Sequence, residues 1–359
     1  MKQIAKNYVV VISFILFSCS TQENRTLDGI FGAIQEIDYM EISLEFANSP
    51  RDIILADSLL IFIDNIDDRR VIISDIRSQT LLRAVFRPGQ GPNDIILPVS
   101  ISYIPSESAI GIFQRQAGVY SEHKLLDLLQ GRLDPTKRIS FTNTGGAIGL
   151  INRPDRLLRA NSKFIGVGFY SYGSLGIYDE TGYLQAIIDT HPQFIRNLES
   201  HLHRYLFGQG SIAFNESSNV LMFASTFTGR ISFYRFTGFE AVQIAYYNLD
   251  KNSRFENRIR GGGRLLETGI LPDDVYHSAE VFATDNYFYV LYYGVSRENV
   301  LAMEHSYILR FTKEGKAVQG YRVNTRLRSF TVSSDDRVLY GITLDDNHEY
   351  ALARIILDF

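Results

Sequence analysis

The sequence predicts an all-β fold, a six-bladed β-propeller whose last blade is closed by an N-terminal strand and which carries one inserted helix. Three observations predict it. Short apolar, β-branched runs recur in groups of four, a turn returns at a nearly constant spacing, and the last group lacks one strand. Five or seven blades are the neighbouring counts. A large β-sandwich is the alternative architecture, but the internal period argues against it.

The first repeat shows the four-strand unit. Its predicted strands, separated by short polar turns, are Asp52–Leu55, Leu59–Ile63, Arg70–Ile73 and Leu81–Phe86. Later repeats begin at Ala147, Gly210 and Ala279. Units of this kind cannot bury their apolar faces alone, so neighbouring units are expected to stack.

The turn between the third and fourth strands marks each repeat. It falls near Gln79, Gly131, Gly182, Gly238 and Gly315, at intervals of 52, 51, 56 and 77 residues. The long interval contains a polar, glycine-rich insert between Asn252 and Pro272. The marker at Gly131 is the weakest, because Leu125–Gln130 also fits a helical turn.

The last repeat holds only three strands, Phe330–Ser333, Val338–Leu344 and Tyr350–Leu357. Asp38–Phe46 alternates polar and apolar side chains in the manner of a strand. We expect this segment to complete the last blade, which closes the ring and removes strand edges that would otherwise invite aggregation.

Pro192–Phe207 breaks the β pattern. Its apolar residues recur near a spacing of 3.6, and proline stands at its start, where a helix tolerates it. The segment predicts a helix of about four turns inserted between two blades.

The N-terminus has the pattern of a bacterial lipoprotein signal. Lys2 and Lys6 precede the apolar run Tyr8–Phe17, and the only cysteine, Cys19, follows. The run is shorter than the roughly 20 residues that span a bilayer. We expect residues 1–18 to be a signal peptide that is removed, Cys19 to carry acyl chains such as palmitate, 19–36 to be a flexible tether and 37–359 to be the propeller. The alternatives are an ordinary secretory signal or a buried structural thiol.

Composition and net charge limit the classes of partner that we expect. The formal charge is −4 and becomes −6 once Lys2 and Lys6 are removed, which disfavours nucleic acid. A single cysteine allows no intramolecular disulfide, so the core alone must hold the fold. We expect a monomer in the cell envelope, attached to a membrane through its N-terminal lipid, with the outer membrane favoured over the inner. No cofactor is predicted.

One loop carries a family resemblance. Arg87-Pro88-Gly89-Gln90-Gly91-Pro92-Asn93-Asp94 resembles the Gly-x-Gly-Pro-Gly-Glu loop of the TolB-like six-bladed propeller lipoproteins of Bacteroidota. It matches at Gly89, Gly91 and Pro92 and departs at Asn93 and Asp94. The resemblance implies the propeller fold and an exported, membrane-anchored location, and it implies no reaction. From the residues alone, the two glycines are expected to adopt positive φ in a tight loop.

Motifs for catalysis and metal binding are weak. No Gly-x-Ser-x-Gly motif occurs, and acylation would occupy the only thiol. His201 and His203 would point away from each other on a helix and could not share a metal. The acidic runs 64–68 and 345–349 lack the glycine and the distal glutamate of a calcium loop, so they are interpreted as solvated turns. No metal site and no catalytic residue is predicted.

The most distinctive polar loop holds Arg258, Arg260 and Arg264 around Gly261–Gly263. Guanidinium groups and backbone amides could converge there on a carboxylate, sulfate or phosphate. A flexible insertion with solvated charges is the alternative.

The loops that lead into inner strands and those that join second to third strands share one face of a propeller, and here they are the long ones. We expect ligand contact on this long-loop face. The candidate ligand-binding residues are Arg87, Gln90, Arg115, Tyr170, Tyr172, Arg204, Arg258, Arg260, Arg264, Tyr293 and Arg328.

The predicted function is a binding or scaffold module that recognises an anionic group of an unknown protein or carbohydrate ligand. The sequence leans away from an enzyme. Two alternatives stay open: a propeller enzyme acting on a carbohydrate or a lactone, and an assembly subunit without a small ligand. An enzyme predicts two carboxylates about 5 to 10 Å apart on the central axis, or a metal cluster.

Overall fold

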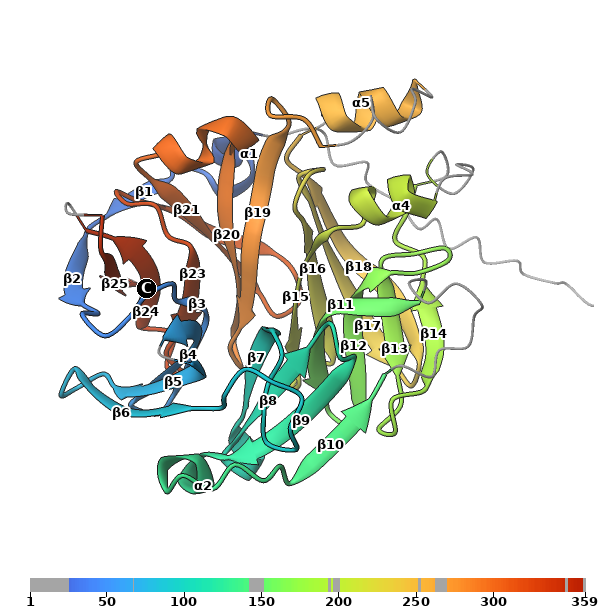
Figure 1. The fold of residues 1–359 in the computed structure, drawn as a ribbon. Helices are drawn as coiled ribbons and strands as arrows, with labels where there is room; N and C mark the ends of the chain where they lie inside the picture. Colours follow the sequence, from blue (N-terminus) through green and yellow to red (C-terminus); the bar gives the residue numbers. More distant parts are fainter. Residues whose placement is uncertain are drawn as a thin grey trace, which may run out of the picture.

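Six separate sheets form a ring in the computed structural model, as Figure 1 shows. The structure describes residues 26–66, 68–141, 152–192, 195, 201–250, 253–261, 270–345 and 348–357. Each sheet is antiparallel in its four main strands, and the ring confirms the predicted six-bladed propeller.

Each blade runs from an inner strand at the axis to an outer strand at the rim. The first three blades are β3 (Arg51–Ala56), β4 (Leu59–Ile66), β5 (Arg69–Asp75) and β6 (Thr80–Val85); β7 (Pro98–Ile104), β8 (Ala109–Gln114), β9 (Val119–Lys124) and β10 (Lys137–Ser140); and β11 (Arg153–Ala160), β12 (Lys163–Phe169), β13 (Leu175–Tyr178) and β14 (Leu184–Ile188).

The other three blades follow the same order. They are β15 (Gly210–Asn215), β16 (Val220–Ser225), β17 (Arg230–Thr237) and β18 (Glu240–Asn248); β19 (Val275–Ala283), β20 (Tyr287–Ser296), β21 (Ser306–Thr312) and β22 (Ala317–Val323); and β23 (Ser329–Val332), β24 (Val338–Leu344), β25 (Tyr350–Ile356) and β2 (Tyr39–Ser43).

The N-terminal segment joins two blades. β2 pairs antiparallel with β25, from Tyr39↔Ile355 to Ser43↔Ala351, so the predicted closure of the last blade is confirmed. β1 (Gln35–Ile37) adds a parallel fifth strand to β22 of the neighbouring blade. The short helix α1 (Leu27–Phe31) precedes it.

The predicted tether 19–36 is therefore too long. The Thr26 hydroxyl accepts the Gly29 N–H and caps α1, and Phe31 is buried. The chain is part of the folded domain from this helix onward, because α1 and β1 cover the outer strand of the fifth blade. Cys19 and the predicted signal peptide lie outside the described residues.

The third blade begins at a different place from the one predicted. Its inner strand is β11, Arg153–Ala160, whereas the sequence pattern placed a strand at Ala147–Ile151, which lies outside the described residues. β11 carries arginines and a proline, and its pairing with β12 is interrupted by a bulge between Pro154 and Arg156. Apolar alternation misses such a strand, because it faces a polar channel.

More helix is present than the single predicted insert. α4 (His201–Phe207) lies within the predicted Pro192–Phe207 helix, of which 193–194 and 196–200 lie outside the described residues. α2 (Leu125–Leu129) is the helical-turn alternative before Gly131. The short helices η1 (Pro105–Glu107) and η2 (Arg297–Ala302) lie in connections between strands.

The helix α5 (Arg254–Arg260) stands in the insert that the sequence presented as a glycine-rich loop. The Ser253 hydroxyl accepts the Glu256 N–H at 3.2 Å, and serine followed three residues later by glutamate is the capping-box spacing. The sequence therefore contains a helix N-terminus at Ser253, although the three following glycines suggested a loop.

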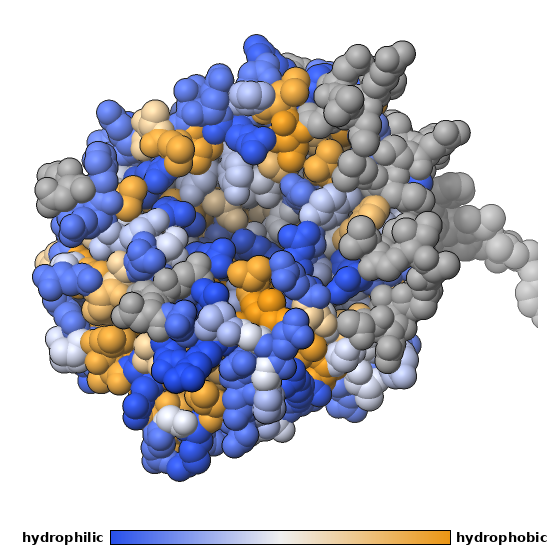
Figure 2. Space-filling model, in the orientation of Figure 1, coloured by the Kyte–Doolittle hydropathy of each residue, from blue (hydrophilic) through white to orange (hydrophobic). Residues whose placement is uncertain are grey.

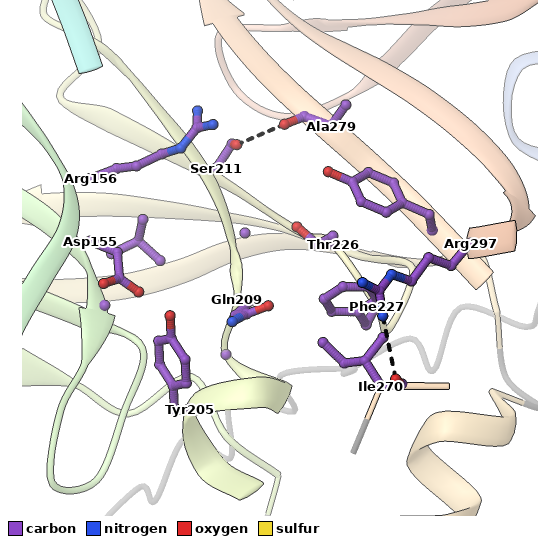
Figure 3. Close-up of a pocket in the computed structure, with 15 residues that line it drawn as sticks. Asp155, Arg156, Tyr205, Gln209, Ser211, Thr226, Phe227, Ile270, Ala279 and Arg297 are labelled. Carbon is purple, nitrogen blue, oxygen red and sulfur yellow. Dashed lines mark hydrogen bonds between the residues drawn. The ribbon is translucent and has the colours of Figure 1, made fainter. Parts of the chain in front are cut away.

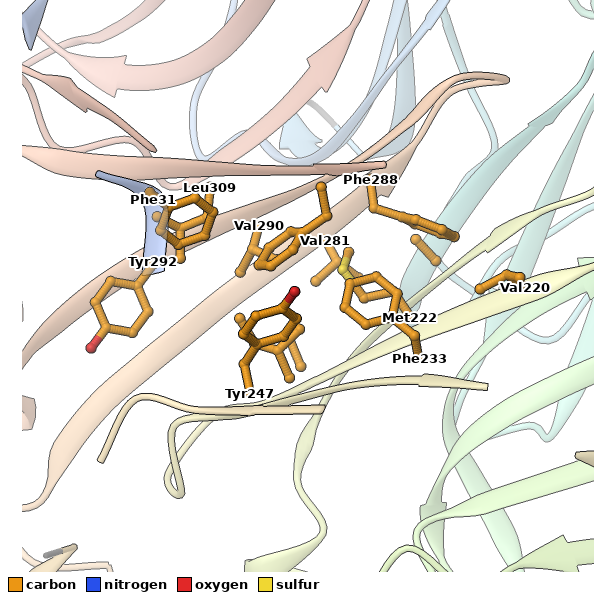
Figure 4. Packing of buried hydrophobic residues seen from close by; sticks show 14 residues of the cluster. Phe31, Val220, Met222, Phe233, Tyr247, Val281, Phe288, Val290, Tyr292 and Leu309 are labelled. Carbon is orange, nitrogen blue, oxygen red and sulfur yellow. The ribbon is translucent and has the colours of Figure 1, made fainter. Parts of the chain in front are cut away.

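The core is divided among the interfaces between blades. Six apolar clusters lie one at each junction of neighbouring blades. In the cluster of Figure 4, Phe233 packs against Phe288 and Phe311 of the next blade with ring centroids 5.6 and 5.3 Å apart. Aromatic rings therefore contribute to the contact between these two blades.

The Arg87–Asp94 loop is compact for a reason other than the predicted one. Gly89 and Gly91 are absent from the residues with positive φ. A Cβ at Gly89 or Gly91 would instead lie 2.4 or 2.7 Å from the Asp94 carboxylate, which accepts the Gly91 N–H at 3.0 Å. Glycine is required there by the close approach of a carboxylate.

Candidate functional site

The inner strands surround the axis, and their polar side chains bond from blade to blade. These bonds join Asp52 to the Ile101 N–H (2.6 Å), Ser100 to the Leu157 carbonyl (3.1 Å), Ser211 to the Ala279 carbonyl (3.1 Å), Glu280 to the Phe330 N–H (3.0 Å) and Ser329 to the Ile53 N–H (3.1 Å). Five of the six inner strands thus place a polar side chain on a neighbour's backbone.

The sixth inner strand, β11, presents Arg156. The pairing of β11 with β12 is irregular between Pro154 and Arg156, and Figure 3 shows Arg156 and Asp155 pointing apart. Among the described residues, Arg156 has no hydrogen-bond or ion-pair partner. Its charge does reach Asp52 and Glu280, where it lowers both pKa values against the effect of burial.

A pocket of about 410 Å³ opens beside Arg156, at the end of the channel on the long-loop face. It lies within the roughly 300 to 1,000 Å³ range of small-molecule sites. Figure 2 shows a hollow in the middle of one face, with hydrophilic residues around much of it. Side chains that line the pocket include Asp155, Arg156, Tyr205, Gln209, Phe227, Tyr276 and Arg297.

One wall of the pocket contains the carboxylate of Asp155, which is paired with an arginine. The Arg115 Nε lies 2.7 Å from Asp155, and the Tyr205 hydroxyl bonds the same carboxylate. Burial raises the pKa of Asp155, while Tyr205 and Arg115 oppose the rise. Arg115 also lies 3.4 Å from the Tyr205 hydroxyl, so blade two, blade three and α4 meet here.

The channel below Arg156 contains a carboxyl pair. Asp52 and Glu280 hydrogen-bond each other, which requires that one of them carries a proton. Burial raises the pKa of both groups, and that of Glu280 rises to about 8. The contact is closer than the separation of about 5 Å or more between glycosidase carboxylates.

α4 supplies part of the pocket wall, and α5 packs behind it. Phe207, Phe227, Phe255 and Ile259 form a buried cluster between these helices and the sheet. Glu256 accepts from Arg260 at 2.6 Å and from Arg230 of β17 at 2.8 Å. Because these contacts hold α5 against the fourth blade, the pocket wall is packed and ion-paired.

The predicted ligand residues have varied positions. Arg115 pairs with Asp155 of the pocket lining, and Arg204 on α4 donates to the Ser171 carbonyl. Arg258 pairs with the buried Asp274, and Arg260 pairs with Glu256, so the two guanidinium groups hold a helix in place instead of converging on one point. Arg264 lies outside the described residues.

Of the candidate ligand-binding tyrosines, Tyr170 and Tyr293 are packing residues. They are 1% and 6% exposed, and their hydroxyls donate to the carbonyls of Gly166 and Leu327. Tyr172 is half exposed, whereas Arg87, Gln90 and Arg328 are exposed outside the pocket lining. Arg328 lies over the Tyr350 ring.

Sequence reasoning missed the residues that meet in the channel: Asp52, Arg156 and Glu280. Each stands in an inner strand of a different blade, so no local motif joins them. The one available signal was charge within predicted strands, since Asp52 begins the first repeat and Glu280 interrupts an apolar run.

No group of three or more His, Cys, Asp or Glu side chains in the described segments of the chain could hold a metal ion. No helix in these segments is long and apolar enough to cross a membrane.

Solved structures share the fold at low sequence identity. A DUF4221 family member from Bacteroides vulgatus has a TM-score of 0.60 at 10% identity, covering 91% of this chain and 97% of its own. A candidate exported protein from Bacteroides fragilis has a TM-score of 0.57 at 12% identity, covering 90% and 95%. The β-propeller domain of Cps50 (Swd1) from Myceliophteria thermophila has a TM-score of 0.51 at 9% identity, covering 89% and 98%.

No family model matches the chain, and no curated protein matches it. At these identities the likeness concerns the fold alone. The chain is therefore a six-bladed β-propeller that is similar in fold to Bacteroides proteins.

Proposed function

We propose that this protein is an envelope binding protein that takes the anionic group of a small ligand into the pocket at the channel mouth. The observation that carries the proposal is Arg156, which lines the pocket and has no hydrogen-bond or ion-pair partner among the described residues. A partly enclosed guanidinium binds a carboxylate or a phosphate through charge-assisted bonds, which are stronger than neutral ones.

The walls of the pocket suggest the rest of the ligand. Tyr205, Phe227 and Tyr276 supply aromatic surface, and Gln209 supplies an amide. Most small-molecule sites combine apolar or aromatic walls with a few polar groups that fix orientation. A ring with one acidic substituent, such as an aromatic acid or an acidic sugar, fits this combination.

The proposed location is the cell envelope. The lipoprotein signal that ends at Cys19 and the loop that resembles TolB-like lipoproteins support a lipid-anchored propeller. In this proposal, acyl chains on Cys19 attach the protein to the outer membrane, and the short segment before α1 keeps the propeller close to the membrane surface.

The enzyme alternative is less well supported by the described site. The carboxylate in the pocket, Asp155, is held by Arg115 and Tyr205, and the channel carboxyls touch each other. Neither arrangement places an acid and a second carboxylate on opposite sides of a substrate bond.

A ¹⁹F NMR comparison tests the proposal. Full-length protein is titrated with 4-fluorobenzoate and with 4-fluorobenzyl alcohol, its uncharged analogue. We expect the acid to bind, and Arg156→Gln to weaken it at least about tenfold, since a hydrogen bond to a charged group contributes about 1.5–3 kcal/mol. Arg328→Gln, which changes an exposed arginine outside the pocket lining, is the matched control. Equal binding of acid and alcohol, or an unchanged affinity in Arg156→Gln, would contradict the proposal.

A further inference from the structure

The carboxyl pair of Asp52 and Glu280 lies in the channel and is not part of the pocket lining. Asp52 belongs to the first blade and Glu280 to the fifth, and the sixth blade lies between them. Each carboxyl accepts one backbone N–H of the following blade, from Ile101 and from Phe330. Although they are far apart in sequence, the two carboxyls are hydrogen-bonded to each other in the channel.

We propose that one proton shared by Asp52 and Glu280 keeps Arg156 available to the ligand, so that anion binding at the channel mouth depends on protonation of this pair. This inference rests on the proposed anion site and says what regulates ligand binding there. With the shared proton, the pair and Arg156 together carry no net charge. Without it, the pair carries two negative charges and competes with the ligand for the single guanidinium.

The charges around the pair support this role. Arg156 of β11 acts on both carboxyls, and Arg51 of β3 acts on Asp52. Burial, and to a smaller extent Glu280, raises the pKa values of Tyr276 on the same strand as Glu280 and of Tyr293 on β20, so both hydroxyls stay neutral. From β23 the neighbouring group is the Ser329 hydroxyl, from β15 it is Ser211, and from η2 Arg297 lies at the pocket.

Burial first and Asp52 second raise the pKa of Glu280, so that the loss of the shared proton falls within a pH range in which binding can be measured. A carboxyl with a pKa of about 8 holds its proton at pH 7 and has lost most of it at pH 9. We therefore expect the affinity for an anion to fall about tenfold between these two values of pH.

The variant Glu280→Gln separates charge from shape. Its amide can donate to Asp52 and accept from the Phe330 N–H, as the protonated glutamate does, but it cannot ionise. Full-length wild type and Glu280→Gln are titrated with 4-fluorobenzoate from pH 6.5 to 9.5. We expect the affinity to fall in wild type and to stay constant in Glu280→Gln. A parallel fall in both proteins would overturn the proposal.

A second measurement does not depend on the ligand. The ¹³C carboxyl shifts of Asp52 and Glu280 are followed with pH in the absence of the probe, with assignment from Glu280→Gln and Asp52→Asn. One group that titrates near pH 8 supports the shared proton, whereas two groups that titrate below pH 6 refute it. Failure of 4-fluorobenzoate to bind at any pH, with the ¹³C titration near 8 intact, would overturn the anion site and leave the shared proton established.

Discussion

Single residues show how closely side chains pack within a blade. Tyr170 follows β12 and packs against its own blade, where its hydroxyl meets that of Tyr178 at 2.9 Å. The glycines of this blade make room for the ring, since a Cβ at Gly176 would stand 2.4 Å from a Tyr170 ring carbon. Glycine inside a strand commonly marks such close approach.

Gly176→Ala should therefore destabilise the protein. The buried ring is held by two hydroxyl bonds and cannot move aside without breaking them, so we expect a loss of about 1–3 kcal/mol, as for overpacked cores. Urea denaturation measures it. Gly261→Ala is the control, because a Cβ there meets nothing closer than 3.5 Å. Equal stability of the two variants would show that Tyr170 does not require the glycine.

At the scale of elements, the N-terminal segment contributes more than one strand. β2 supplies the fourth strand of the sixth blade, and β1 extends the fifth. Arg322 of β22 bonds Glu36 of β1 at 2.6 Å, but this pair is largely exposed and adds little. The closure therefore depends mainly on backbone pairing and on buried side chains such as Ile42 and Leu44.

Removal of β2 should open the ring. We expect a chain that begins at residue 47 to aggregate, because two neighbouring strand edges and the apolar face beneath them become exposed. A chain that begins at Leu27 retains α1, β1 and β2 and serves as the control. Size-exclusion chromatography and thermal melting compare the two. A monomeric 47–359 chain with the melting temperature of the control would show that closure by β2 contributes nothing to stability.

At the scale of the whole molecule, a rigid ring places one pocket on the long-loop face. Six apolar interfaces hold the blades, while the axis is lined by polar side chains that bond from strand to strand. α4 and α5 add a packed wall to the same face. Loops on rigid scaffolds commonly carry binding sites, which agrees with the ligand site proposed on this face.

Lipidation of Cys19 would place that ring at a membrane. Cells that express the protein and are fed an alkyne fatty acid should label wild type and leave Cys19→Ala unlabelled, since Cys19 is the only thiol in the chain. The labelled band is read after coupling to a fluorophore. Equal labelling of both proteins would remove the lipoprotein interpretation.

The sequence by itself determined the blade count, the marker turns and the closing strand. These features are local or periodic: an alternating Asp38–Phe46, and a turn with positive φ at Gln79, Gly131, Gly182, Gly238 and Gly315. Stacking of blades then follows from the apolar faces that each repeat must bury.

Only the tertiary structure decided which polar residues meet. Asp52, Arg156 and Glu280 come together because ring closure places the inner strands of three blades around one axis, and no spacing in the sequence encodes that distance. The arginines flanking the glycine insert looked like the anion site in sequence, but Arg258 and Arg260 are ion-paired on α5. An arginine is available to a ligand only when the fold leaves it without a hydrogen-bond or ion-pair partner, and the partners that neighbouring blades supply are set by long-range packing.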